Sequence, residues 1–324
     1  MRRSRLGRST VEITELSFGA AALGNLFTEV DPDQAAATVA AAYDEGIRHF
    51  DTAPHYGLGL SERRLGEALR DRPRHAYTVS TKAGRLLEPL TPAEAAARTG
   101  LSEGFAVPHT HRRRWDFSAD GIRRSVEGSL ERLGLDRVDV VHLHDPDDHG
   151  EAAFREGYPA LEKLRAEGMV GAIGAGMNQT AMLTRFLRET DVDAVLCAGR
   201  HTLLDHEALD ELLPEALARG RAVVVGGVFN SGLLADPRPG ARYDYQAAPA
   251  PLLERALRLR TVTERRGVPL RAAALHHPLR HPAVAAVLVG ARSPEEIRDA
   301  AAQLRTPVPD ALWDDLRDEG LLPA

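Results

Sequence analysis

The amino-acid sequence predicts an α/β fold, a (β/α)8 TIM barrel that forms a single domain over residues 1–324. Three observations lead to this prediction. Helical and extended segments alternate along the chain, as they do when helices cover a parallel sheet. Eight extended segments are nearly continuous apolar runs, which is typical of strands buried on both faces. The length of 324 residues lies within the range of one such barrel, roughly 200 to more than 400 residues.

The strands are expected where apolar runs follow the ends of helices. The first helix shows the pattern: Asp31 can cap it, Pro32 takes its first position, Gln34 can complete a capping box, and Gly46 ends it. The next apolar run follows at once. The eight expected strands are residues 16–19, 48–51, 76–82, 138–144, 170–174, 194–197, 222–226 and 284–289.

Three further segments are expected to lie outside these strands. Residues 5–16 read as a short N-terminal hairpin. Residues 84–118 after strand three and residues 230–251 after strand seven are too long for ordinary connections. Both long loops begin at the carboxyl end of a strand, where barrel enzymes build their active sites. We therefore expect both loops to border a site.

Composition excludes several classes of partner. A net charge of -6 provides no general attraction to nucleic acid or anionic lipid, and 43% hydrophobic residues are typical of a globular protein. The single cysteine, Cys197, cannot form an intrachain disulfide, which favours a reducing compartment. We find no signal-peptide-like run and no apolar segment near the roughly 20 residues that cross a bilayer. The sequence predicts a soluble, cytoplasmic protein and leaves its oligomeric state open.

Four ionisable residues lie at or just beyond the carboxyl ends of strands two, three and four. They are Asp51, Tyr56, Lys82 and His144. Because the carboxyl ends of barrel strands face one mouth, these side chains are expected to meet there. Any one of them alone is weak evidence for a site, whereas the four together are strong evidence.

The segments around these residues resemble the signature of the aldo-keto reductases. GIRHFDTAPHYG at residues 46–57 and SERRLG at 61–66 carry the resemblance, which continues through HDP at 144–146, IGAG at 173–176 and VGARSPE at 289–295. The resemblance runs almost the length of the chain. It implies a nicotinamide-dependent oxidoreductase that moves a hydride between the cofactor and a carbonyl or hemiacetal.

The resemblance also implies roles for the four residues. Tyr56 would exchange a proton with the substrate, since a phenol with an ordinary pKa near 10 is a ready donor but a poor base. The Lys82 ammonium would lower the pKa of Tyr56, and Asp51 would hold Lys82 in place. His144 would donate a hydrogen bond to the substrate oxygen and orient it.

The cofactor contacts come from the same resemblance. The diphosphate is expected near the loop after strand seven, the adenosine end near residues 290–300, and the carboxamide near Asn178. Glu296 stands where many members place a basic residue for the 2′-phosphate, so NAD is favoured over NADP, although Arg292 would attract that phosphate. Glu296 can instead complete a capping box with the Ser293 amide. The expected contacts are Gly19, Asn178, Phe229, Ser231, Gly232, Leu233, Gly290, Arg292 and Glu296.

Within the family, the sequence resembles a subgroup that includes the D-threo-aldose, L-fucose and L-galactose dehydrogenases and pyridoxal 4-dehydrogenase. DFSADGIRRS at residues 116–125 and NSGLLA at 230–235 carry this match, as do Gly226 and Cys197, which replace an aromatic residue and a glutamine common elsewhere in the family. Their substrates can cyclise to hemiacetals. The resemblance therefore implies oxidation of a sugar or pyridoxal-like hemiacetal to a lactone, with expected substrate contacts His55, Trp115, Asp116 and Asp145.

Three alternatives stay open. The first is a general aldehyde or ketone reductase, and the second is a nicotinamide-binding regulatory subunit, against which the intact four residues argue. The third is a metal-dependent hydrolase barrel at His142 and His144, which would share one strand face. We favour a buried, hydrogen-bonded His142 and expect no metal, because no further ligands are evident. His276, His277 and His281 lie in a helix-like stretch, where a structural role is expected.

Overall fold

Eight parallel strands form the centre of the molecule. The structure is a computed structural model that describes residues 1–323. Each strand pairs with the next along the chain and the last pairs with the first, which closes the barrel. The predicted fold class is confirmed. The strands are β3 (Leu16–Gly19), β4 (His49–Asp51), β5 (Thr78–Ala83), β8 (Val138–His144), β9 (Val170–Met177), β10 (Ala194–Ala198), β11 (Ala222–Gly226) and β14 (Val284–Gly290).

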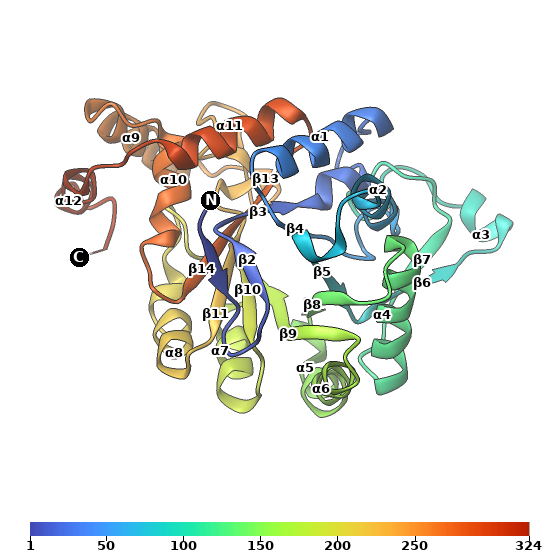
Figure 1. Ribbon diagram of the computed structural model, residues 1–324. Coiled ribbons are helices and arrows are strands. Elements are labelled where there is room, and N and C mark those ends of the chain that lie inside the picture. The colour runs from blue at the N-terminus through green and yellow to red at the C-terminus, as the bar shows by residue number, and fades with distance from the viewer. Residues whose placement is uncertain (324) are drawn as a thin grey trace.

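Helices surround the strands on the outside (Figure 1). The main helices are α1 (Pro32–Asp44), α2 (Leu60–Leu69), α4 (Ala119–Leu133), α6 (Tyr158–Ala166), α7 (Thr180–Glu189), α8 (Leu212–Arg219), α9 (Ala250–Arg265), α10 (Leu270–Leu279), α11 (Pro294–Arg305) and α12 (Asp310–Asp318). Two are short, α3 (Pro92–Ala96) and α5 (Gly150–Ala152). Within residues 1–323, none has the length and apolar character of a membrane-spanning helix.

Strand β11 is apolar throughout because its residues contribute to two hydrophobic clusters. In β11, Val223 and Val225 pack into the large cluster shared with the helices. Val224 between them belongs to a second cluster, together with Leu6 and Ile13 of the N-terminal segment. Alternate residues of a strand point to opposite faces, so both faces of β11 require apolar side chains.

The N-terminal segment forms the expected hairpin from β1 (Arg3–Arg5) and β2 (Glu12–Thr14). Figure 1 shows this hairpin lying in front of the barrel strands. Leu6 and Ile13 are at most 1% exposed and pack against Val140, which lies near the amino end of β8. The hairpin therefore covers the amino end of the barrel, and the opposite end remains for the long loops.

Both long loops contain strands of their own. The first folds into an antiparallel pair, β6 (Arg85–Pro89) and β7 (His111–Trp115), with α3 between them. The second contains the short pair β12 (Arg242–Tyr243) and β13 (Gln246–Ala247). In Figure 1 the β6–β7 pair and α3 project from the barrel beyond α2.

Some predicted boundaries and one cap were wrong. Ala76 was assigned to strand three but lies in a 3-10 turn, and β9 continues to Met177 because Met177 still pairs with Cys197 of β10. Asp31 caps α1 by accepting from the amides of Asp33 and Gln34. The Gln34 side chain does not return to the cap, since its Nε2 donates to the Arg292 carbonyl at 2.8 Å.

Candidate active site

The buried ion pair between Lys82 and Asp51 forms the base of the site. Asp51 is the last residue of β4, and Lys82 lies near the end of the neighbouring β5. Lys82 Nζ donates to Asp51 Oδ2 at 2.6 Å and to the Thr52 carbonyl at 3.0 Å. Both charged side chains are at most 3% exposed. Two buried opposite charges in such close contact hold one another in a single geometry.

Tyr56 lies above this pair in the turn that follows β4. Its ring centroid is 4.8 Å from Lys82 Nζ and 6.0 Å from the His144 ring. Gly57 follows with a φ of 62°, and a Cβ there would lie 2.2 Å from the Gly24 carbonyl oxygen. Only glycine tolerates this close approach, which fixes the turn that presents Tyr56. Asp51, Tyr56, Lys82 and His144 thus come together as the sequence predicts.

Lys82 acts to lower the pKa of Tyr56, as expected, but the sequence did not reveal the larger effect of burial. Burial raises the pKa of this phenol to about 12, and the nearby Lys82 ammonium only partly offsets that effect. The expected lowering by Lys82 is present but smaller, because a phenolate loses much of its hydration in this position. Burial acts to lower the pKa of Lys82, yet Asp51 and Tyr56 outweigh it and the pKa is raised. At neutral pH, Tyr56 is therefore a neutral phenol beside an ammonium.

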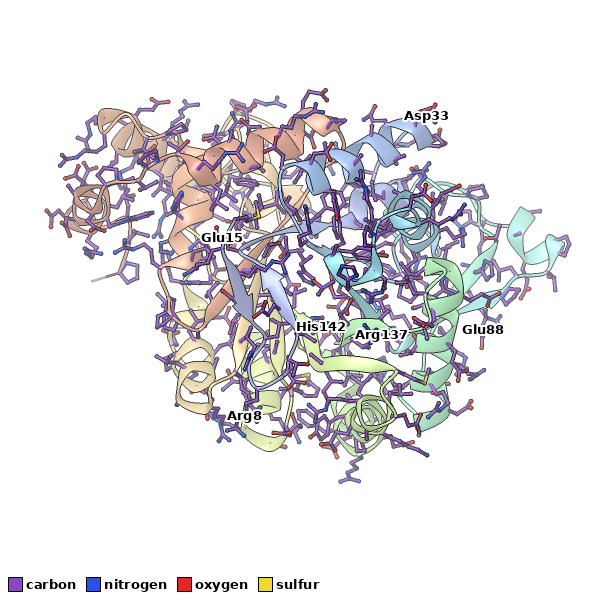
Figure 2. All side chains as sticks on the ribbon, viewed as in Figure 1. Arg8, Glu15, Asp33, Glu88, Arg137 and His142 are labelled. Atoms are coloured by element: carbon purple, nitrogen blue, oxygen red, sulfur yellow. The ribbon has the colours of Figure 1, made fainter. Side chains whose placement is uncertain are left out.

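Two histidines of β8 lie one above the other inside the barrel. Burial, with the Arg85 and Lys82 charges, lowers the pKa of His144 well below its usual value. Burial lowers the pKa of His142 to about 3, and Figure 2 shows His142 toward the centre of the molecule. His142 Nδ1 has no hydrogen-bond partner, so the expected hydrogen bond of this nitrogen is missing. Its neighbours across the two ladders are Lys82 and Gly174, and Gly174 has no side chain to supply a hydrogen bond.

Sequence reasoning missed the polar residues that support Asp51. His49 bonds Ser17 Oγ through Nδ1 at 2.9 Å and Ser80 Oγ through Nε2 at 3.1 Å. Ser80 Oγ in turn donates to Asp51 Oδ1 at 2.7 Å. His49 and Ser80 lie two residues before Asp51 and Lys82 on their strands, so the two-residue period of a strand places them on the same face. That spacing was the available signal.

A cavity of about 220 Å³ opens at Asp145, the residue that follows His144, and none of the four mouth residues is among those that line it. Of the expected substrate residues, Trp115 and Asp145 line it, and the His55 ring lies 5.6 Å from the His144 ring. Asp116 does not join them, because its carboxylate accepts from Ser118 and pairs with two arginines. The lining residues are Arg85, Trp115, Asp145, Asp147, Asp148, His149, Asn178 and Gln179.

On the other side of the mouth, three strands end in glycines. Gly19 and Gly290 pair across β3 and β14, and Gly226 ends β11. A Cβ at Gly290 would meet only the Gly19 carbonyl, at 3.6 Å. Beyond β11, the Asn230 side-chain oxygen is buried without a hydrogen-bond partner. Bare backbone and an unpartnered polar atom fit a cofactor lying along this rim, where Gly19 and Gly290 were expected to contact it.

The remaining expected cofactor residues lie in three separate places: the loop after β11, Asn178, and the start of α11. After β11, the amides of Gly232 and Leu233 donate to the carbonyls of Phe229 and Asn230, so they are used within the turn. Ser231 has a φ of 58°, and its Oγ accepts from the Tyr245 amide. These bonds leave fewer free donors for a diphosphate than we expected. Asn178 lies apart, in the cavity at Asp145.

At the start of α11, Glu296 does not bond the Ser293 amide as we expected. Its Oε2 accepts from the Arg292 amide at 2.7 Å, and Ser293 Oγ caps the Glu296 amide at 3.3 Å. The carboxylate therefore lies beside the backbone of Arg292. Glu296 lies in the first turn of α11, the helix that follows β14.

Comparison with known proteins identifies the family of this chain. Residues 15–318 match the profile of the Aldo/keto reductase family. The chain belongs to that family. Among its relatives, D-threo-aldose 1-dehydrogenase from Pseudomonas sp. is 45% identical, over 96% of this chain and 95% of the relative. Pyridoxal 4-dehydrogenase from Microbacterium luteolum is 41% identical, over 98% and 97%. L-galactose dehydrogenase from Arabidopsis thaliana is 31% identical, over 92% and 86%.

Solved structures agree with this family assignment. An aldo-keto reductase from Bacillus halodurans, in its holo form, superposes with a TM-score of 0.75 at 26% identity, over 98% of this chain and 96% of that one. The resemblance to aldo-keto reductases and to the sugar and pyridoxal dehydrogenase subgroup is confirmed. This aldo/keto reductase is an NAD(P)-dependent oxidoreductase. Membership of an enzyme family disfavours the hydrolase and regulatory-subunit alternatives.

Proposed function

We propose that this aldo/keto reductase oxidises a hydroxylated hemiacetal, such as an aldose or a pyridoxal-like ring, to a lactone. The observation that carries the proposal is the cavity at Asp145. The cavity offers carboxylate and amide groups that suit several hydroxyls, from Asp145, Asp147, Asn178 and Gln179, and the partly exposed aromatic ring of Trp115. The names of the D-threo-aldose and pyridoxal dehydrogenase relatives support the same substrate class.

The four residues at the mouth have defined roles in this proposal. When bound, the nicotinamide cofactor accepts the hydride from the anomeric carbon. The phenolate form of Tyr56, which the Lys82 ammonium stabilises, takes the proton of the anomeric hydroxyl and becomes the neutral phenol. Asp51 holds Lys82 in position through the 2.6 Å contact. His144 donates a hydrogen bond to the same substrate oxygen, so that hydride and proton leave from neighbouring atoms.

A general aldehyde or ketone reductase is the second candidate, because one observation favours it. The pKa of Tyr56 is raised to about 12 by burial, which makes the phenol a better proton donor than acceptor at neutral pH. The proposed oxidation should therefore accelerate about tenfold per pH unit through the neutral range, as more phenolate becomes available. Reduction should change little over that range. Pre-steady-state rates in both directions from pH 6.5 to 9 would measure this difference.

A substrate panel tests the proposal directly. The panel contains L-fucose, L-galactose, D-arabinose, pyridoxal and simple aldehydes, each with NAD and NADP, and cofactor absorbance reports turnover. Tyr56→Phe should lower kcat by about 10²- to 10⁴-fold, because it removes the proton-transfer group. Full activity of Tyr56→Phe would contradict the proton-transfer role. Inert sugars together with fast reduction of small aldehydes would leave the reductase as the function.

We further propose that NAD is the preferred cofactor. Support comes from Glu296, whose carboxylate next to the Arg292 backbone would repel a 2′-phosphate. Glu296→Gln should raise the relative kcat/KM with NADP by about tenfold, which corresponds to roughly 1.4 kcal/mol. Glu295→Gln, which removes the same charge one residue earlier on α11, is the matched control and should leave the ratio unchanged. If both variants had the same ratio of kcat/KM with NADP to kcat/KM with NAD, Glu296 would not be the residue that distinguishes the two cofactors.

The proposed location is the cytoplasm. Its support is the single cysteine, Cys197, which is buried, and burial raises the pKa of its thiol to about 12. Such a thiol is unreactive toward disulfide exchange and gives no sign of an oxidising compartment.

A further inference from the structure

Arg85 lies next to the proposed catalytic residues but has no role in the mechanism described so far. It begins β6, directly after Gly84, whose φ of 107° turns the chain out of β5. The guanidinium carbon lies 4.1 Å from the centre of the Trp115 ring, and the side chain is only 12% exposed. Its Nε is buried and has no hydrogen-bond partner. A buried arginine with an unused donor is costly to retain unless its charge is paired.

The Arg85 guanidinium holds the carboxylate of Asp145. Arg85 Nη2 donates to Asp145 Oδ2, and the same oxygen lies 3.6 Å from His144 Nε2. Asp145 has a φ of 40°, which is uncommon for a residue other than glycine, and its amide donates to the Gly176 carbonyl at 3.0 Å. The backbone thus keeps Asp145 beside His144. Both the Arg85 guanidinium and the His144 ring can reach its carboxylate.

Two groups compete for this carboxylate. At 3.6 Å, the contact from His144 Nε2 is longer than a hydrogen bond, whereas the contact from Arg85 is a direct ion pair. His144 Nδ1 is buried without a partner, so a proton on Nε2, facing the carboxylate, is the favoured tautomer. Without Arg85, an unpaired Asp145 carboxylate would turn to that N–H and bind it. The N–H would then be unavailable to a substrate oxygen.

We propose that Arg85 is a positioning residue that holds the Asp145 carboxylate away from His144 and so keeps the Nε2–H free to bind the substrate oxygen. The proposal rests on the role of His144 as hydrogen-bond donor, and it does not depend on which carbonyl or hemiacetal reacts. Arg85 acts through Asp145 and contacts neither reacting atom in this scheme.

A double-mutant cycle tests the proposal. Arg85→Met keeps the length of the side chain and should lower kcat at least tenfold, with a smaller change in KM. In an Asp145→Asn background there is no carboxylate to capture His144, so the same Arg85→Met change should cost less than twofold. Arg85→Lys retains the charge and should recover most of the activity. Arg114→Met, on the adjacent β7, removes the same charge from a more exposed site and is the matched control.

A second measurement does not depend on turnover. In ¹⁵N-histidine spectra assigned with His144→Gln, Arg85→Met should raise the pKa of His144, and the acid limb of kcat should move to higher pH with it. The other groups facing this ring are Lys82, Tyr56, His55 and His142, and they are unchanged in the variant. An unshifted His144 titration in folded Arg85→Met would overturn the proposal.

The experiments distinguish a failure of the positioning role of Arg85 from a failure of the proposed hemiacetal oxidation. The cycle is measured with any substrate that the wild type turns over, so inert sugars would remove only the sugar assignment. An Arg85→Met loss of equal size in both backgrounds would instead show that Arg85 acts without Asp145. A loss confined to KM would likewise contradict the positioning role, because it would assign Arg85 to substrate binding.

Discussion

Two clusters of buried and half-buried side chains differ in character, and only one of them resembles an active site. The mouth cluster consists of Asp51, Tyr56, Lys82 and His144. The histidine cluster consists of His201, His206, His277 and His281, with ring centroids 5.2 Å apart for His201 and His277, 5.7 Å for His206 and His277, and 6.3 Å for His201 and His281. It packs against Trp313 of α12.

The two clusters share perturbed histidines. Burial lowers the pKa of His201 to about 4 and that of His277 well below its usual value, as it does for His144. Both clusters also contain buried ring nitrogens without hydrogen-bond partners. A lowered histidine pKa therefore reports burial in both places, and it does not by itself distinguish a site.

The difference between them is the presence of opposite charges. Lys82 and Asp51 form a 2.6 Å ion pair at the carboxyl ends of β5 and β4, the end of the barrel at which the cavity lined by Asp145 opens. In the described chain, no carboxylate pairs with a ring of the histidine cluster, and no set of three histidine, cysteine or carboxylate side chains there or elsewhere is arranged to hold a metal. The structural role expected for His277 and His281 agrees with this arrangement. The mouth cluster thus combines charges of both signs, which the histidine cluster lacks.

The largest expected effect comes from removing the cation of the mouth cluster. Lys82→Met leaves Asp51 buried and unpaired, which should lower the free energy of unfolding by about 3–5 kcal/mol. It should also lower kcat by about 10²- to 10⁴-fold, because Tyr56 loses the charge that stabilises its phenolate. Urea unfolding and steady-state kinetics measure both effects. Lys163→Met, on the exposed surface of α6, is the control and should change neither.

The next prediction compares a histidine whose ring nitrogens are hydrogen-bonded with one whose ring nitrogens have no hydrogen-bond partner. Both ring nitrogens of His201 lack partners, whereas both of His49 are hydrogen-bonded. His201→Phe should therefore leave kcat unchanged and keep or raise stability, while His49→Phe should lose about 1–3 kcal/mol and some activity. If His201→Phe lowered kcat tenfold while remaining folded, the histidine cluster would have a functional role and the comparison would fail.

The smallest effect is the pH dependence of stability. The folded-state pKa of His201 is lowered from 6.5 to about 4, so the unfolded chain binds its proton first as the pH falls below 6.5. Stability from this group is complete above pH 6.5 and is lost toward pH 4, with about 1 kcal/mol lost between pH 7 and 5.5. His201→Phe should remove this part of the pH dependence of the free energy of unfolding, measured by urea unfolding at several pH values. An unchanged pH dependence would mean that His201 does not contribute to it.

Local sequence patterns were sufficient to predict the barrel and the positions of the four mouth residues. Strands buried on both faces require apolar runs, and the carboxyl ends of barrel strands meet, so the places of Asp51, Lys82 and His144 followed from their order along the chain. The same two-residue period would also have found His49 and Ser80. These features depend on residues close together in sequence, or on the rule that the carboxyl ends of all barrel strands lie at one end of the barrel.

Other features depended on contacts between distant segments, and only the tertiary structure decided them. Arg85 meets Asp145 across 60 residues of sequence, and the net shift of the Tyr56 pKa depends on how fully the surrounding loops bury it. Glu296 bonds the Arg292 amide in place of the Ser293 amide that the capping pattern favoured. The sequence by itself determined which chemical groups reach the mouth, because strand order and period are local. Their protonation and pairing were decided by folding, because desolvation and charge act through space between residues that the sequence separates.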